Sequence, residues 1–383
     1  AAAILSDSSL WMWGGHWSRQ LDDGMTVNRI EPVSVVMEDV VAVSTSGSHT
    51  GAIKSDGSLW MWGTNNVGQL GDGTTENSEV PKRIMDGVVV VSVFGDTTAV
   101  VKTDGSLWAW GYNGYGQLGN DTTEDSLVPV KIMDNVRDVV LGPSIASAIK
   151  SDGSLWMWGY NRDGRLGNGT YENSTVPVFV MDNVEQVALS GDHSAAVSSD
   201  GSLWMWGDNG YGKLGNGTGT SSAVPIKIMD DTVEVSLGGD CSAAIKTDGS
   251  LWLWGKNVIA RKGGSSFSLV PTRVMDGVDD VICFGDVFAI LRHEEYVLTG
   301  DTCRTEIGDY QAVASLADPG NCIWSDGTTD PKEINWSIDG YDIDMSGVTF
   351  EDTTMEWTGL PRRLEISGEL PEGVLVSYTG NDN

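Results

Sequence analysis

The stretch SLWMWG occupies residues 58–63 and returns unchanged at 154–159 and 202–207. Close variants lie at 106–111 (SLWAWG) and 250–255 (SLWLWG). The L-W-x-W-G segments are spaced by 49 and then four times by 48 residues, starting at Leu10, Leu59, Leu107, Leu155, Leu203 and Leu251. A fixed period of this size is typical of propellers and solenoids. We therefore expect a repeat architecture.

Each repeat contains four short apolar segments separated by turn residues. In the third repeat these are SLWAWG (106–111), LVPVKIM (127–133), VRDVVLG (136–142) and ASAIK (146–150). The last segment reaches the next repeat through Ser-Asp-Gly-Ser, and an Asp-Gly between alternating segments indicates a β-hairpin. Four strands in about 48 residues predict one propeller blade per repeat.

Twelve of the sixteen tryptophans lie in the L-W-x-W-G segments. In a strand, Trp108 and Trp110 point to one face while Leu107 and Ala109 point to the other, so both faces are apolar. A blade between two others buries both faces, and each buried aromatic side chain removes roughly 150–250 Å² from water. We predict that these tryptophans form the core between blades: Trp60, Trp62, Trp108, Trp110, Trp156, Trp158, Trp204 and Trp206.

The composition excludes some partners. The net charge of −31 argues against nucleic acid and anionic membranes, which both require a positive surface. No apolar run reaches 18 residues, so membrane insertion is not expected. The first residues, from Ala1, match the inside of a repeat, which indicates a fragment of a longer protein.

The four cysteines form no C-x-x-C pair, so zinc is not expected. Cys241 and Cys283 fall at repeat positions that are expected to be buried. Cys303 and Cys322 lie outside the repeats; they either form a disulfide or remain two free thiols.

The repeats resemble the RCC1 (regulator of chromosome condensation) family. The resemblance rests on WGYNGYGQLGNDTTEDSLVPVKI (110–132), WGTNNVGQLGDGTTENSEVPKRI (62–84) and WGDNGYGKLGNGTGTSSAVPIKI (206–228). It covers about residues 1–291 and implies an all-β, seven-bladed β-propeller. Six L-W-x-W-G strands but seven copies of the preceding strand type are visible, the first at 1–5 and the last at 287–291. Both six and seven blades fit, and the first strand being cut favours seven.

After residue 293 the sequence changes character. Segments 308–338 and 347–380 resemble pieces of the small immunoglobulin-like MBG/YDG modules that stand in tandem on bacterial surface proteins. The predicted domains are therefore a propeller at 1–293, a partial module at 294–339 and a second partial module at 340–383. This resemblance implies a bacterial source and an extracellular or cell-surface location.

No catalytic, phosphate-binding or dinucleotide motif is visible. His49 and His193 occupy equivalent repeat positions, which hold Thr97 and Cys241 in other repeats, so hydrogen-bonded inner positions are expected rather than ligands. The acidic loops at 71–78 and 120–126 lack the D-x-D-x-D spacing of a calcium loop. We expect no enzyme activity, cofactor or metal.

Loops after each W-G vary in sequence and carry residue types that dominate binding hot spots. The candidate rim residues are Trp17, Tyr112, Tyr115, Tyr160, Arg162, Arg165, Tyr211 and Arg261. They predict a monomeric, non-enzymatic head that binds a protein or glycan in adhesion. The alternatives are a guanine-nucleotide exchange factor or other regulatory protein, as in nuclear members of the family, and a secreted enzyme inhibitor.

Overall fold

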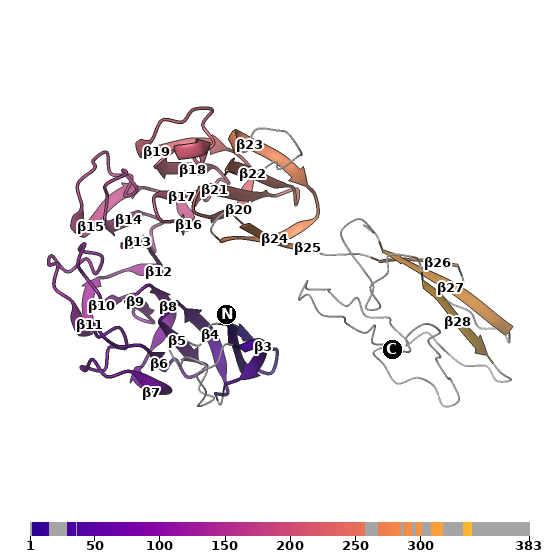
Figure 1. Ribbon diagram of the computed structural model, residues 1–383, viewed down its shortest axis with the longest axis horizontal. Helices are drawn as coiled ribbons and strands as arrows, with labels where there is room; N and C mark the ends of the chain where they lie inside the picture. The colour runs from indigo at the N-terminus through magenta and orange to yellow at the C-terminus, as the bar shows by residue number, and fades with distance from the viewer. Residues whose placement is uncertain are drawn as a thin grey trace. The chain divides into compact units, whose positions relative to one another are not determined.

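The computed structural model of the chain describes residues 2–14, 29–35, 37–256, 267–284, 287–292, 296–300, 308–316 and 332–338. One compact unit comprises Ala1–Asp276 with Val281–Ala289, and the other comprises Gly277–Asp280 with Ile290–Asn383. The described elements are strands except for one short 3-10 helix, η1 (Gly210–Gly212), which confirms the all-β class (Figure 1). Within these residues, no helix has the length and apolar character needed to span a bilayer.

Five sheets of the first unit have four antiparallel strands each, and in every sheet the strands follow the chain from one edge to the other. The sheets are β4 (Val40–Thr45), β5 (His49–Lys54), β6 (Leu59–Gly63) and β7 (Ser78–Met85); β8 (Val88–Phe94), β9 (Thr97–Lys102), β10 (Leu107–Gly111) and β11 (Ser126–Met133); β12 (Val136–Gly142), β13 (Ile145–Lys150), β14 (Leu155–Gly159) and β15 (Ser174–Met181); β16 (Val184–Leu189), β17 (His193–Ser198), β18 (Leu203–Gly207) and β19 (Ser222–Met229); and β20 (Thr232–Leu237), β21 (Cys241–Lys246), β22 (Leu251–Lys256) and β23 (Phe267–Met275).

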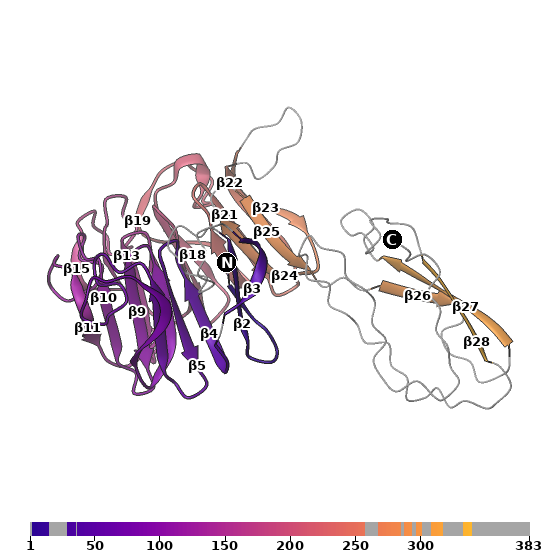
Figure 2. The ribbon, with the colours of Figure 1, turned by 60° about the horizontal axis from the view of Figure 1, so that its bottom comes forward.

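The first strand of each sheet lies innermost in the first unit. Strands β4, β8, β12, β16 and β20 contact one another in succession, while the fourth strands form the outer edges (Figure 1). Figure 2 shows the same sheets following one another around the unit. Each outer strand contains a proline, which cannot donate a backbone hydrogen bond and so blunts the free edge: Pro81, Pro129, Pro177, Pro225 and Pro271. This is the predicted propeller arrangement.

Two further sheets contain fewer than four strands. β1 (Ala2–Ile4), β2 (Leu10–Gly14) and β3 (Arg29–Ser34) form one, and β24 (Val278–Phe284) pairs with β25 (Val287–Arg292) in the other. By their repeat positions, β1–β3 correspond to the second to fourth strands of a blade, and β24–β25 to the first and second. The number of blades in the closed ring stays a prediction.

The two tryptophans of each L-W-x-W-G strand are buried to different degrees. The second one, such as Trp158, is fully buried and packs with Leu107 and Ala109 of the preceding sheet and with Leu118 of the loop that follows β10. Its indole Nε1 donates a hydrogen bond of 2.8 Å to the Gln117 carbonyl. Trp62, Trp110, Trp206 and Trp254 are also fully buried. The indoles of Trp110, Trp206 and Trp254 donate the equivalent hydrogen bond, to the carbonyls of Gln69, Arg165 and Lys213. These side chains join each sheet to its neighbour.

The first tryptophan of each pair is only half-buried, although the sequence places it among the core positions. Trp156 is an example. Its ring packs edge-on against Phe179 of the outer strand β15, so it lies near the outer edge of the sheet and is only partly covered. Its Nε1 donates to the Ser154 hydroxyl in the hairpin at the end of its own sheet. Trp60, Trp108 and Trp204 are likewise half-buried.

The second unit contains one described sheet, in the order β26 (Tyr296–Gly300), β27 (Gly308–Leu316) and β28 (Lys332–Ile338). Its strands are antiparallel, with Tyr310 opposite Trp336. The immunoglobulin-like identity of this region and the boundaries at 293 and 339 stay predictions. Cys303, Cys322 and the predicted module at 340–383 lie outside the described residues.

Candidate binding surface

One rim of the propeller is built from the loops that follow β6, β10, β14 and β18, at 64–77, 112–125, 160–173 and 208–221. Each loop begins with a backbone hydrogen bond to the turn between the first two strands of its own sheet. The N–H of Tyr112 donates to the Asp96 carbonyl, and that of Tyr160 to the Ser144 carbonyl, both at 2.9 Å. The first residues of these loops are therefore held in equivalent places on one rim.

A buried asparagine fixes the shape of each loop. The Asn113 amide donates to the carbonyls of Thr122 and Glu124 at 3.0 Å, while its Oδ1 accepts the N–H of Leu118. Asn65, Asn161 and Asn209 make the same contacts in their loops. The amide side chain thus supplies hydrogen-bond partners to backbone carbonyls and to a backbone N–H of the loop, which have no partner in a β-sheet. The sequence analysis did not predict this role. The asparagine that recurs every 48 residues could have indicated it.

The N-x-x-G-x-L-G segment, with Gln, Arg or Lys before the leucine, anchors each loop on the next sheet. Leu118 is fully buried and belongs to the core beneath Trp158. Gly119 has a φ of +80°, and a Cβ there would lie 2.7 Å from the Trp158 indole nitrogen. Glycine is thus required by both the left-handed backbone and the close approach of the ring. The rim loops are consequently anchored to a rigid core.

Three tyrosines of the predicted rim come together across two sheets. The rings of Tyr112 and Tyr115 lie 6.4 Å apart, and those of Tyr115 and Tyr160 lie 5.0 Å apart, both edge-to-face. Tyr112 and Tyr115 are 36% and 40% exposed, and Tyr160 is half-buried between them and Arg165. We call Tyr112, Tyr115 and Tyr160 the tyrosine cluster. It is an ordered, partly exposed aromatic surface.

Arg165 supports this cluster from below, and it is only 5% exposed. Its guanidinium carbon lies 4.9 Å from the centre of the Tyr160 ring, and the group donates to the Gly191 carbonyl and to Asp163. The sequence places Arg165 among the candidate anchors, but its charge is directed into the protein. Arg162, three residues earlier, is exposed.

The other candidates do not extend the tyrosine cluster into a continuous ring. Tyr211 is 50% exposed and has a left-handed backbone, with φ of +59°. Its ring lies 6.3 Å from that of Phe267 and 5.2 Å from the Lys256 ammonium, so it forms a second aromatic group. Asp208 occupies the place that Tyr160 holds in the previous loop. Trp17 and Arg261 lie outside the described residues.

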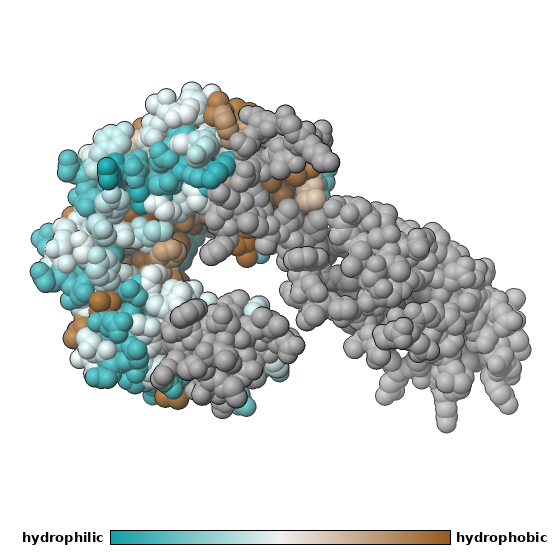
Figure 3. All heavy atoms as spheres, viewed as in Figure 1, coloured by the Kyte–Doolittle hydropathy of each residue, from teal (hydrophilic) through white to brown (hydrophobic). Residues whose placement is uncertain are grey.

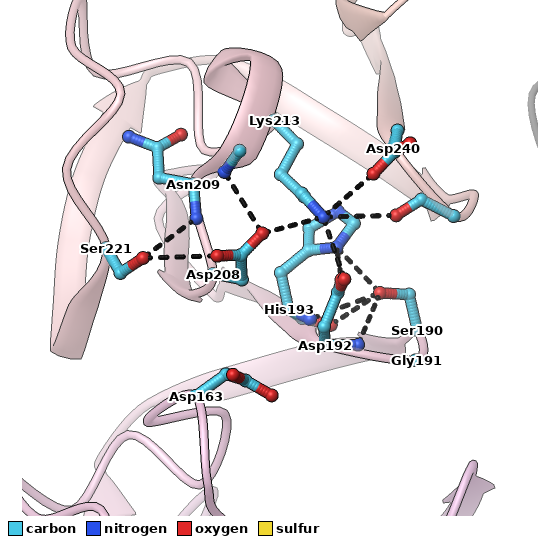
Figure 4. Close-up of polar contacts among 12 residues, drawn as sticks. Asp163, Ser190, Gly191, Asp192, His193, Asp208, Asn209, Lys213, Ser221 and Asp240 are labelled. Atoms are coloured by element: carbon cyan, nitrogen blue, oxygen red, sulfur yellow. Dashed lines mark hydrogen bonds and ion pairs between the residues drawn. The ribbon is translucent and has the colours of Figure 1, made fainter.

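A cluster of charged side chains at the rim surrounds Lys213, which the sequence analysis did not predict as a site residue (Figure 4). Its ammonium contacts Asp192 at 2.8 Å, Asp208 at 2.9 Å and Asp240 at 3.1 Å, and its side chain is 1% exposed. Burial opposes the charge, but the hydrogen bonds that the ammonium donates to Asp192 and Asp208 raise the pKa of Lys213 above its ordinary value. Lysine at the place of Gln69 and Gln117 was the available signal.

The buried histidines are hydrogen-bonded on both ring nitrogens. His49 places Nε2 2.8 Å from the Thr98 hydroxyl, while Nδ1 lies 3.1 Å from the Ser46 hydroxyl. His193 likewise contacts Ser242 through Nε2 and Ser190 through Nδ1. Among the residues that the structure describes, no group of three or more histidine, cysteine or acidic side chains could hold a metal ion.

The stability of the propeller is expected to fall below neutral pH because of His49. Burial lowers the pKa of His49 from 6.5 to about 4. Between these two pH values the unfolded chain therefore binds a proton at this side chain, and the folded chain does not. The stabilisation that comes from the neutral His49 is complete above pH 6.5 and is lost as the pH falls toward 4. The free energy of unfolding should fall by roughly 2–3 kcal/mol over this range. Urea unfolding at several pH values measures this loss.

The matched variant is His49→Thr, because Thr97 occupies the equivalent buried position of the next sheet. It should flatten the stability profile between pH 6.5 and 4, leaving the part due to His193. An unchanged profile in this variant would show that His49 does not control the acid sensitivity.

On the face drawn in Figure 3, hydrophilic residues cover most of the described surface and hydrophobic ones lie in separate patches. The loops at 112–125 and 160–173, which carry the tyrosine cluster, also carry the exposed acids Asp121, Glu124, Asp125 and Glu172. This surface combines aromatic rings with negative charge, which suits a polar or basic ligand better than an apolar one.

Residues 1–315 match the family described as the RCC1-like domain. Curated protein sequences gave no match. Human WBSCR16 has a similar structure, with a TM-score of 0.63 at 19% identity over 86% of this chain and 88% of that chain.

Prp20p from Saccharomyces cerevisiae gives a TM-score of 0.64 at 22% identity, over 74% of this chain and 78% of that chain. Yeast RCC1 (Prp20) in a structure with Kap60 gives 0.64 at 21%, over 76% and 77%. These likenesses show the shared fold. The repeats, the propeller sheets and the match over 1–315 together place the chain in the family of RCC1-like domains.

Proposed function

We propose that this chain is a non-enzymatic binding module that holds a protein or glycan ligand at the rim of its propeller. The tyrosine cluster carries the proposal. Tyrosine supplies a large contact area at low entropic cost, because it has few rotatable bonds, and it is enriched in binding hot spots. The rings already contact one another, and Arg165 backs Tyr160, so little ordering remains to be done when a ligand arrives.

The finer parts of the proposal rest on the sequence. The resemblance to RCC1 repeats supports a seven-bladed ring. The resemblance of the C-terminal region to bacterial immunoglobulin-like modules supports an extracellular or cell-surface adhesion protein, with the propeller as a monomeric head. The net charge of −31 supports a ligand other than nucleic acid, and basic groups on that ligand would find complementary charge at the rim.

Two alternatives belong to the same class of interaction protein. Prp20p has binding properties toward Gsp1p and histones, which keeps a guanine-nucleotide exchange factor or other regulatory interaction protein as the first alternative. An inhibitor of a secreted enzyme is the other. At 22% identity the likeness transfers the fold and no partner.

The first test is a binding screen of the full chain against matrix proteins, mucins, glycans and a small GTPase. The variant Tyr112→Ala/Tyr115→Ala/Tyr160→Ala should lose at least tenfold in affinity for the true ligand, since truncating hot-spot residues costs about 1.4 kcal/mol or more. Titration calorimetry or surface plasmon resonance measures the change.

The matched control is Phe179→Ala, which removes an aromatic that is 46% exposed on the outer strand β15. It should leave the affinity unchanged. Equal losses in both variants would indicate general destabilisation, and a ligand that ignores the triple substitution would contradict the tyrosine cluster as the site. Binding of the GTPase alone would move the proposal to the regulatory alternative.

A further inference from the structure

Two of the four cysteines meet at the junction between β21 of the last complete sheet and β24 of the next. Cys241 begins β21 and is fully buried, and Cys283 in β24 is 8% exposed. The Cys283 N–H donates to the Ser236 hydroxyl of β20 at 2.9 Å, and its thiol donates to the Ser236 carbonyl at 3.3 Å. The side chains of Cys241 and Cys283 lie within interaction distance of each other. Both residues lie within the first compact unit.

The same two positions hold no cysteine pair at the other junctions. The position of Cys283 is taken by Val93, Leu141, Leu189 and Leu237 in four sheets and by Thr45 in the first complete sheet. The position of Cys241 is taken by His49, Thr97, Ile145 and His193. Side chains of several kinds thus fill these two positions at the other junctions, and packing does not explain a thiol on both sides of this one.

We propose that Cys241 and Cys283 are an oxidation site that closes into a disulfide between the two sheets. The bond would secure β24–β25, which is a two-stranded sheet among the described residues. Such a sheet has little stability of its own and depends on its neighbour. The cross-link would also close a long chain loop in the unfolded state, which raises stability by limiting that state.

The oxidant is a disulfide compound, such as glutathione disulfide or a dithiol–disulfide oxidoreductase. One cysteine thiolate attacks it, forms a mixed disulfide and expels a thiolate. The second cysteine then attacks the first cysteine's sulfur and expels the other half of the oxidant. The protein loses two protons and two electrons, and the oxidant is reduced to two thiols.

The burial of both thiols decides when this exchange occurs. The hydrogen bond with Cys241, together with burial, raises the pKa of the Cys283 thiol, so the folded protein offers almost no thiolate there. Thiolate is the reactive form. The bond should therefore form during folding, before β24 docks, and the folded reduced chain should react slowly.

The experiment unfolds the full chain with a reductant and refolds it either in glutathione redox buffer or with the reductant kept. Free thiols are then alkylated, and peptides are mapped by mass spectrometry. We expect a cross-linked peptide pair containing Cys241 and Cys283 in the oxidised sample only. The thermal unfolding midpoint of the protein refolded in redox buffer should exceed that of the reduced protein by about 5–10 °C.

The variant Cys283→Leu restores the residue type of Leu141 and Leu237 and should melt at the same temperature in both buffers. Recovery of Cys241 and Cys283 in alkylated form after oxidative refolding would overturn the proposal. So would cross-links from either residue to Cys303 or Cys322. The result is independent of the ligand, since the site lies between sheets and not in the tyrosine cluster.

Discussion

Replacing Trp158 with alanine is expected to destabilise the propeller by about 3–5 kcal/mol in the free energy of unfolding, the usual range for deleting a buried aromatic side chain. Trp158 is fully buried between two sheets, and it packs on Leu107 and Leu118. The variant leaves a cavity at this junction and also leaves the Gln117 carbonyl without the indole N–H. Urea unfolding followed by circular dichroism measures the change.

Trp156→Ala is the matched control, because it deletes the same side chain two residues earlier in the same strand. Trp156 is half-buried and donates to a serine in its own hairpin, so its loss should cost clearly less. Trp158→Phe keeps a six-membered aromatic ring and removes the hydrogen bond together with a smaller volume, so its cost should lie below that of Trp158→Ala. Equal costs for Trp156→Ala and Trp158→Ala would contradict the assignment of the second tryptophan as the link between sheets.

The second large effect is expected at Lys213. Lys213→Ala should destabilise the protein by about 3 kcal/mol at neutral pH, because Asp192, Asp208 and Asp240 would face one another without their shared cation. The three carboxylates retain some exposure to water, which places the expected value at the low end for a broken buried ion pair. Lys213→Gln is the matched variant, since Gln69 and Gln117 occupy the same place in other repeats.

The pH dependence identifies the cause. Burial opposes the charge of Asp192, but hydrogen bonds from His193 and Lys213 lower its pKa to about 2. This contribution is complete above the unfolded pKa of about 4 and is lost as the pH falls toward 2. Without Lys213 the clustered carboxylates bind protons more readily when folded.

The gap in stability between the natural protein and Lys213→Ala should therefore narrow as the pH falls from about 5 to 2. Unfolding by urea across that range measures it. A gap that stays constant with pH would show that lost packing of the lysine side chain, and not charge, explains the cost. Lys213→Gln should lie between the two, because glutamine keeps a donor but carries no charge.

The sequence was sufficient for the fold because the information is local. The period of two in L-W-x-W-G sets which residues share a face, and the Asp-Gly turns set the hairpins, as in the pairing of β13 with β14. The 48-residue repeat then gives the sheets and the buried second tryptophan. The exposure of the first tryptophan did not follow from alternation, because it depends on how closely the outer strand and the hairpin serine cover it.

The site could be predicted only in part. The sequence alone determined that the chain builds four-stranded repeats and that Tyr112, Tyr115 and Tyr160 stand in their loops. Only the tertiary structure decided that these rings touch, that Arg165 turns inward, that Lys213 meets three aspartates and that Cys241 meets Cys283. The partners in the last two contacts are up to 42 residues apart, and they meet because neighbouring sheets pack face to face. That packing depends on the fit of whole sheets, which no local pattern of residues encodes.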